Sequence, residues 1–276
     1  MLPTILEKCG KVGLGGEGVL RTYSQTVEAR EVIKAAINCG ITYFDSARVY
    51  ADSEVYYGSV WRKSPKMRSG IFQASKSASR DRKGALSDLE ETLARLGTDY
   101  LDLWQIHDVR TSYDLRTISG PGGALEAFEE ARSSGKVRFI GVTGHHDPDI
   151  LTRALTDWPV DAVMMPVNPV EGVLGGFLTS TLPAAGKKGI AVIGMKVLGA
   201  SHYILLKFGI TPELLLRYAL SHDINITIVG CSTAEEVKTL ADTGCDLKPL
   251  SGRERSHLIQ VFEPYARRLA YYRGVT

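Results

Sequence analysis

The chain has 276 residues, of which 44% are hydrophobic and 23% are charged. This length allows one large core, and we expect a single domain over residues 1–276. The 33 Lys and Arg residues nearly balance the 31 Asp and Glu residues, which leaves a net charge of +2. Such a balance argues against an extended nucleic-acid-binding surface.

The N-terminus and the cysteines bear on where the protein resides. The first ten residues, MLPTILEKCG, lack the apolar region of a signal peptide, and the run VDAVMMPV is too short to span a bilayer. The four cysteines form no C-x-x-C pair, and a metal site needs clustered ligands. We therefore expect a cytoplasmic protein with no membrane segment and no metal site. The sequence does not predict the oligomeric state.

Short apolar strands alternate with amphipathic helical stretches along the chain. The predicted strands are Val12–Gly15, Tyr43–Asp45, Ile71–Ser75, Leu101–Ile106, Phe139–Val142, Ala162–Pro166, Ala191–Lys196 and Ile226–Val229. The predicted helices are Thr26–Cys39, Ser53–Arg62, Asp81–Leu96, Gly123–Ser134, Pro148–Thr156, Leu182–Lys188, Pro212–Ser221 and Ala234–Asp242. A further helix over Gly252–Ala270 is expected to cap the barrel from outside.

Eight strand–helix pairs favour a closed (β/α)8 barrel over an open, doubly wound sheet. A doubly wound dinucleotide-binding sheet needs G-x-G-x-x-G after its first strand. The chain has GLGGEG over Gly13–Gly18, in which the glycine spacing does not fit that motif. The sequence therefore predicts an α/β fold of the TIM-barrel type.

Polar side chains stand at the ends of three consecutive predicted strands. Asp45 ends the second strand, Lys76 follows the third and His107 follows the fourth, while Tyr50 lies in the loop after the second. In a βα barrel the carboxyl ends of the strands meet at one rim, where catalytic groups gather. Any one of these residues alone could be a capping or ion-pairing residue, but four at one rim favour a catalytic site.

These four groups suit the protonation of an oxygen atom on which negative charge develops. A tyrosine hydroxyl has an ordinary pKa of about 10, and a neighbouring lysine ammonium is expected to lower it. A carboxylate would hold that lysine, and a histidine would hydrogen-bond a carbonyl oxygen. Side chains cannot supply a hydride, so reduction of a carbonyl would need a nicotinamide cofactor.

The stretch GITYFDSARVYADSE resembles the second-strand signature of the aldo-keto reductases. LSDLEETLARLGTDYLDLWQIHD, GKVRFIGVTG and GIAVIGMKVLG are similar to later parts of the same family. The resemblance implies a (β/α)8 barrel preceded by a short N-terminal hairpin near Leu2–Lys11. It also implies reduction of small carbonyl compounds, with Tyr50 as proton donor, Lys76 tuning it, Asp45 anchoring Lys76, and His107 orienting the carbonyl.

The resemblance implies a cofactor site in which several family residues are replaced. Thr143, Gly144 and Met164 stand where the family has Ser, Asn and Gln around the carboxamide, and Asn168 or His145 could substitute for the lost amides. Met195 stands in place of a stacking aromatic residue, and Lys196 in place of Ser near the pyrophosphate. The expected cofactor-binding residues are Gly16, Thr143, Gly144, Met164, Asn168, Met195, Lys196, Leu198, Gly199, Gly230, Ser232 and Glu236.

The adenosine end leaves the choice of cofactor open. In the family, basic residues at the start of the eighth helix bind the 2′-phosphate of NADP(H). Here that stretch, GCSTAEEVKTL, has Glu236 in place of a basic residue. Family resemblance therefore favours NADP(H), while the missing basic residues allow NAD(H).

Two other functions remain open at this stage. Relatives such as the regulatory β subunits of potassium channels bind the cofactor mainly to modulate a partner, and the losses at Gly144 and Met164 fit such a role. A barrel isomerase without nicotinamide would need a phosphate site that MKVLGAS and GCSTAE could mimic. For an enzyme, a short, open site would favour small aldehydes, α-dicarbonyls or sugars.

Overall fold

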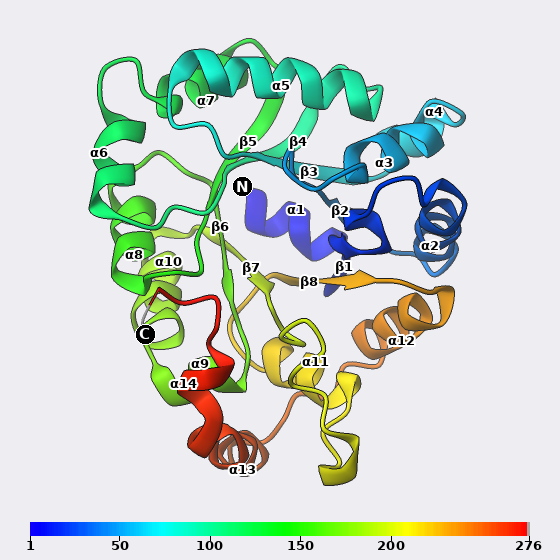
Figure 1. Ribbon diagram of the computed structural model, residues 1–276, viewed down its shortest axis with the longest axis vertical. Coiled ribbons are helices and arrows are strands. Elements are labelled where there is room, and N and C mark those ends of the chain that lie inside the picture. Colours follow the sequence, from blue (N-terminus) through cyan, green and yellow to red (C-terminus); the bar gives the residue numbers. More distant parts are fainter. Residues whose placement is uncertain (275–276) are drawn as a thin grey trace.

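The computed structural model describes residues 1–274, apart from the side chain of Pro65. Eight parallel strands in these residues close into a barrel in the order β1-β2-β3-β4-β5-β6-β7-β8, with helices around the outside (Figure 1). The predicted (β/α)8 fold is therefore confirmed. The right-handed connection of each strand through a helix to the next parallel strand produces this ring.

The elements follow one another in a regular alternation. The strands are β1 (Val12–Gly18), β2 (Tyr43–Asp45), β3 (Phe72–Ser77), β4 (Leu101–Ile106), β5 (Val137–Thr143), β6 (Ala162–Pro166), β7 (Ala191–Met195) and β8 (Ile226–Cys231). The helices of the first half are α1 (Leu2–Lys8), η1 (Val19–Arg21), α2 (Thr26–Asn38), α3 (Ser53–Trp61), α4 (Pro65–Ser69), α5 (Arg82–Leu96), α6 (Ser112–Ser119) and α7 (Ala124–Ser133). Those of the second half are α8 (Pro148–Asp157), α9 (Pro169–Leu174), η2 (Phe177–Thr181), α10 (Leu182–Lys188), η3 (Leu206–Phe208), α11 (Pro212–Leu220), α12 (Ala234–Cys245), α13 (Gly252–Phe262), η4 (Glu263–Tyr265) and α14 (Ala266–Leu269).

Helix α5 shows how local sequence sets these boundaries. The carboxylate of Asp81 accepts a hydrogen bond from the Gly84 N–H at 2.8 Å and caps the first turn. Leu89, Leu93 and other apolar residues of the helix are buried against the barrel. Gly97, in the left-handed conformation, ends the helix as a C-terminal glycine commonly does.

The predicted N-terminal hairpin is wrong, because the first residues form helix α1. Pro3 fits the first turn of a helix, and Leu2 and Leu6 lie four residues apart on one face. Both leucines are buried in the cluster that fills the barrel, together with Tyr43 and Phe72. Since β1 begins only four residues after α1, the helix closes the end at which the strands begin (Figure 1).

Several other boundaries differ from the sequence-based expectation, among them those of β3 and of the C-terminal helix. Lys76 lies within β3, which continues to Ser77, and so it takes part in the regular alternation of the strand. The single helix expected over Gly252–Ala270 is interrupted by η4, where Pro264 has no N–H to continue the helical hydrogen bonds. Within residues 1–274, no helix combines the length and the apolar character needed to cross a membrane.

Candidate active site

A buried ion pair lies at the carboxyl end of the barrel. Lys76 Nζ contacts a carboxylate oxygen of Asp45 and donates a second hydrogen bond to the carbonyl oxygen of Ser46 at 2.7 Å. Each side chain of the pair is 1% exposed. Burial raises the pKa of Asp45, and the ammonium of Lys76 opposes that rise. The pair is thus a fixed, desolvated charge arrangement.

Tyr50 lies directly beside this pair. Lys76 Nζ is 4.9 Å from the centre of its ring, and the Arg21 guanidinium is 4.8 Å from the same centre. A Cβ at Gly16 would lie 2.8 Å from the Asp45 carbonyl oxygen and 2.9 Å from Cδ2 of Tyr50. A glycine at position 16 therefore allows strand β1 to approach the tyrosine ring closely.

The pKa of Tyr50 differs in direction from the sequence-based expectation. Burial, followed by the carboxylate of Asp45, raises the pKa of Tyr50 above its ordinary value. The guanidinium of Arg21 opposes this rise in the pKa without reversing it. The phenol is therefore protonated at neutral pH.

His107 lies on the other side of Tyr50, with the two ring centres 5.6 Å apart in an edge-to-face arrangement. Burial, followed by the charge of Lys76, lowers the pKa of His107 to about 3. The imidazole is therefore neutral at pH 7, with one nitrogen that donates and one that accepts. Its Nδ1 is buried without a hydrogen-bond partner within the described residues.

Gln105 is a residue of this site that was not among those predicted from the sequence. Its side-chain amide lies 3.5 Å from Asp45 Oδ1, on the side of the carboxylate away from Lys76. Side chains two residues apart on a strand point the same way, so the predicted role of His107 already implied that Gln105 faces the barrel interior. Gln105 limits the positions that the Asp45 carboxylate can take.

The loop that carries Tyr50 is held from behind by Arg95. Ala51, directly after Tyr50, has a φ of 41°, which is strained for a residue with a Cβ. Arg95 of α5 donates a hydrogen bond to the Ala51 carbonyl oxygen at 2.6 Å and lies 3.6 Å from the carboxylate of Glu54. Glu54 is itself buried and accepts hydrogen bonds from Ser75 and Thr92.

Arg95→Met is therefore expected to lower kcat about tenfold with a smaller change in KM, because it releases the loop and leaves Glu54 without its cation. Arg82→Met is the matched control, since Arg82 lies on the same helix in an exposed ion pair with Glu130. Steady-state kinetics on both variants, with thermal unfolding alongside, would test this. Equal kcat values in the two variants would show that Arg95 does not position Tyr50.

The side chains expected around the carboxamide are largely engaged in contacts within the protein. The Thr143 hydroxyl accepts a hydrogen bond from the Asp108 N–H at 2.8 Å and so holds the loop after β4. Met164 is buried in the cluster that fills the barrel. At Gly144 a Cβ would lie 3.0 Å from the Val109 carbonyl oxygen, so little room exists for the larger amide found in the family.

Asn168 is a helix cap in this structure. Its side-chain oxygen accepts a hydrogen bond from the Glu171 N–H, and its NH₂ group donates to the Lys196 carbonyl oxygen and the Tyr272 hydroxyl, all at 3.0–3.1 Å. These bonds use most of what an asparagine side chain can form. Asn168 therefore shapes the rim through the loops it joins.

The loop after β7 presents a cation at the same rim. Lys196 follows Met195 with a φ of 54°, and burial lowers the pKa of its ammonium. Within the described residues it forms no ion pair. Leu198 is partly exposed in this turn, and Gly199 packs against the ring of Tyr203. Lys196 is thus available to an anionic group at the mouth.

At the end of β8 the predicted residues surround the start of helix α12. Gly230 packs against Glu17 of β1. The Thr233 hydroxyl caps the helix, and the Ser232 N–H donates to a carboxylate oxygen of Glu236 at 2.6 Å. The carboxylate thus occupies a helix N-terminus, the kind of position that otherwise attracts phosphate.

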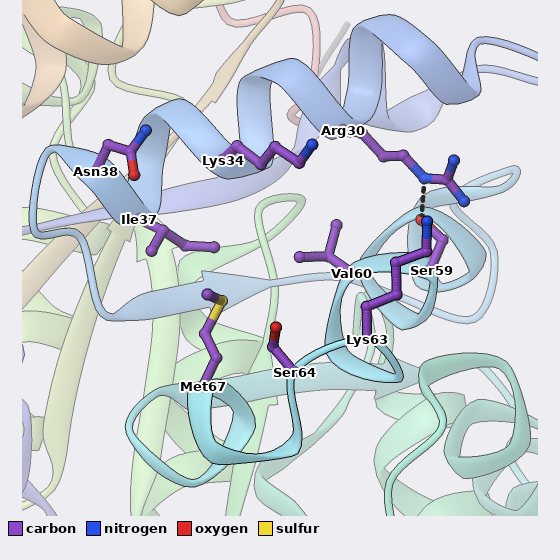
Figure 2. A pocket seen from close by; sticks show the side chains of 9 residues that line it. All are labelled: Arg30, Lys34, Ile37, Asn38, Ser59, Val60, Lys63, Ser64 and Met67. Carbon is purple, nitrogen blue, oxygen red and sulfur yellow. Dashed lines mark hydrogen bonds between the residues drawn. The ribbon is translucent and has the colours of Figure 1, made fainter.

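A separate hollow of about 260 Å³ lies outside the barrel between α2, α3 and α4 (Figure 2). Its lining comes largely from the last turns of α2 and α3, which places it toward the end where the strands begin. The residues that line it are Arg30, Lys34, Ile37, Asn38, Ser59, Val60, Lys63, Ser64 and Met67. None of the residues at the catalytic rim reaches this hollow.

A family model described as "Aldo/keto reductase family" matches residues 9–203, which is more than half of the chain. The chain belongs to the aldo/keto reductase family. The match includes Asp45, Tyr50, Lys76 and His107 but ends before β8, so the residues at Gly230–Glu236 are compared with the family on sequence resemblance alone.

Curated relatives of this family member are distant. It is 29% identical over 201 residues to L-galactose dehydrogenase from Arabidopsis thaliana, a match that covers 67% of this chain and 60% of the relative. It is 32% identical over 165 residues to glyoxal reductase from Bacillus subtilis, covering 55% of this chain and 56% of the relative. The chain thus matches less than two thirds of the length of these relatives.

Solved structures of aldo-keto reductases share the fold. A holo form from Bacillus halodurans has a TM-score of 0.75 at 21% identity, with 91% of each chain covered. An enzyme from Klebsiella pneumoniae in complex with NADPH has a TM-score of 0.73 at 23% identity, with 91% of this chain and 90% of the other covered. At these identities the likeness concerns the barrel itself.

Proposed function

We propose that this protein reduces aldehydes or ketones to alcohols with a reduced nicotinamide cofactor. The observation that carries the proposal is the buried Lys76–Asp45 pair with Tyr50 and His107 against it at one rim. Family membership and the names of the reductase and dehydrogenase relatives support the same reaction class.

Tyr50 is the proposed proton donor to the substrate oxygen. Its raised pKa keeps the proton on the phenol until negative charge develops on that oxygen. The ammonium of Lys76 then stabilises the phenolate as it forms, and Asp45 holds the ammonium in place. Neutral His107 donates its ring N–H to the same oxygen and so orients the carbonyl.

The residues at the mouth fit a dinucleotide cofactor in part. Lys196 offers a cation for a pyrophosphate, and Met195 offers a polarisable surface for a flat ring. The carboxamide end has fewer free partners, since Thr143 and Asn168 are engaged within the protein. When bound, the reduced nicotinamide supplies the hydride that no side chain can supply.

We propose further that the site accepts NADH as well as NADPH. The carboxylate of Glu236 at the start of α12 repels a 2′-phosphate and takes the Ser232 N–H that would otherwise bind it. NADH has a free 2′-hydroxyl at this position and avoids that repulsion.

Glu236→Arg is expected to tighten NADPH binding about ten- to hundredfold and to change NADH binding little, since a hydrogen bond to a charged group contributes about 1.5–3 kcal/mol. Glu235→Arg is the control, because Glu235 is exposed in the same turn and makes no contact with Ser232. Fluorescence titration of each variant with both nucleotides measures the ratio of the Kd for NADH to the Kd for NADPH. An unchanged ratio in Glu236→Arg would contradict this assignment of the 2′-phosphate position.

The proposed reaction is tested directly by following oxidation of NADH and NADPH with a panel of small aldehydes, α-dicarbonyls and sugars. Turnover with any of them supports the enzyme. Tight nucleotide binding without turnover would instead support a cofactor-binding regulator, the function of relatives such as the potassium-channel β subunits. Failure to bind either nucleotide would contradict both.

A further inference from the structure

The segment Tyr271–Gly274 crosses the loops that follow β5 and β6. His145 Nδ1 lies 3.0 Å from the Tyr272 carbonyl oxygen, and the Gly274 N–H donates to the His146 carbonyl oxygen at 3.3 Å. The amide of Asn168 donates to the Tyr272 hydroxyl at 3.0 Å. Figure 1 shows this red segment beside α8 and α9, which are about a hundred residues away in sequence.

A buried ion pair fixes the segment in this position. The Arg273 guanidinium pairs with Glu171 of α9, whose side chain is 0% exposed, and also donates to the Gly175 carbonyl oxygen. The Tyr272 hydroxyl donates to the same carboxylate at 2.7 Å. Leaving a buried carboxylate without its partner is costly, so these contacts specify one position of the segment.

The position brings the ring of Tyr272 to the predicted cofactor site. Tyr272 is 6% exposed, its ring centre lies 5.6 Å from Lys196 Nζ, and the His145 ring meets it edge-to-face at 6.0 Å. His145 and Asn168 follow β5 and β6, where the nicotinamide end of a cofactor is expected, and Lys196 follows β7, near the expected pyrophosphate. Strand β7 itself offers only Met195 there, so Tyr272 supplies the aromatic ring beside Lys196 and His145.

We propose that Tyr272 forms a wall of the cofactor site and contacts the bound nicotinamide nucleotide, and that Arg273 is its positioning residue. The proposal rests on the proposed function, because it requires that a nicotinamide nucleotide binds at this mouth. Tyr272, near the C-terminus, would then provide the flat aromatic surface that strand β7 lacks. Tyr271, its neighbour, is 52% exposed and meets the rings of His202 and Tyr272 edge-to-face, and so it is expected to contribute less to the cofactor site.

The first test compares Tyr272→Leu with Tyr271→Leu in fluorescence titrations with NADH and NADPH. Loss of an aromatic contact surface is expected to raise the Kd for both nucleotides about tenfold in Tyr272→Leu, against less than about twofold in Tyr271→Leu. Tyr272→Phe keeps the ring and is expected to bind nearly as tightly as the wild type. A folded Tyr272→Leu with an unchanged or lower Kd would overturn the proposal.

The role of Arg273 is tested by the Kd for the nucleotides, a quantity that a loss of stability alone would not change in a protein that remains folded. Arg273→Met is expected to raise the Kd for both nucleotides, and Arg273→Lys, which keeps the charge facing Glu171, is expected to restore it in large part. Equal Kd values in the wild type and Arg273→Met would show that the ion pair does not position Tyr272 for the cofactor.

A second test uses the unmodified protein and so does not depend on whether a variant folds. Hydrogen–deuterium exchange of residues 270–274 is expected to slow when NADH is added, because the nucleotide would pack against this segment. Unchanged exchange at saturating NADH would overturn the inference while the proposed function stands. A wild-type protein that binds neither nucleotide would overturn the proposed function itself, and the inference with it.

Discussion

Tyr50→Phe is expected to reduce kcat by about 10²- to 10⁴-fold, the range that a positioned general acid contributes. The substitution keeps the ring, which packs against Gly16 and lies beside Lys76 and His107, and removes only the hydroxyl. The ammonium of Lys76 cannot take over, because it is 1% exposed and already bonded to Asp45 and Ser46. The proton would then have to come from water or from His107, whose pKa of about 3 leaves little of it protonated at pH 7.

The measurement is steady-state reduction of 4-nitrobenzaldehyde with NADH and with NADPH, alongside a titration of each nucleotide. Tyr23→Phe is the matched control, because Tyr23 is an exposed tyrosine that precedes α2. The Kd for the nucleotides is expected to remain within about twofold of the wild type in both variants, since no cofactor contact depends on the hydroxyl. Wild-type turnover by Tyr50→Phe would refute its role as the proton donor.

The grouping of Asp45, Tyr50, Lys76 and His107 followed from two simple features of the sequence. Each of the three strands is a short apolar run that leads into a polar residue, and parallel strands of a barrel share one carboxyl rim. The same reasoning, applied through the two-residue period of a strand, would also have found Gln105 beside Asp45. These features are local, which is why the sequence predicts them.

The start of α9 also has a local sequence pattern that the prediction did not use. Asn168 precedes Pro169, and Asn at the cap followed by Pro in the first turn is a typical helix start. That pattern predicts a cap for Asn168, which is how the structure uses its side chain. The cofactor role predicted for Asn168 did not take this helix start into account.

Other parts of the site depend on contacts that sequence patterns do not encode. The ion pair of Arg273 with Glu171 joins residues about a hundred positions apart, and no pattern in either segment predicts which residue the other contacts. The hairpin expected in place of helix α1 came from the family resemblance alone, since seven residues are too few to show clear helical periodicity. In both cases burial against a distant element determines the structure, and local propensity does not.

Lys76→Met is expected to lower the free energy of unfolding by about 3–5 kcal/mol at pH 7.5, the usual result of removing one partner from a buried ion pair. Methionine nearly matches the length of lysine, so the loss comes mainly from the isolated carboxylate of Asp45 and less from a cavity. Urea unfolding at several pH values measures it. Lys136→Met is the control, since Lys136 pairs with Glu90 in an exposed position, where such pairs contribute about 0–1 kcal/mol.

The pH dependence separates electrostatics from packing. Burial raises the pKa of Asp45 in the folded protein, and without Lys76 nothing comparable opposes the rise. A carboxyl whose pKa is higher in the folded than in the unfolded state favours folding at low pH and loses that contribution as pH rises. The deficit of Lys76→Met relative to wild type is therefore expected to shrink between pH 7.5 and pH 5, and the double variant Lys76→Met, Asp45→Asn is expected to recover much of it at pH 7.5. The loss in free energy of unfolding could instead be the same at both pH values and remain in the double variant. Lys76 would then contribute packing alone, and the charge proposed to stabilise the phenolate of Tyr50 would lack its physical basis.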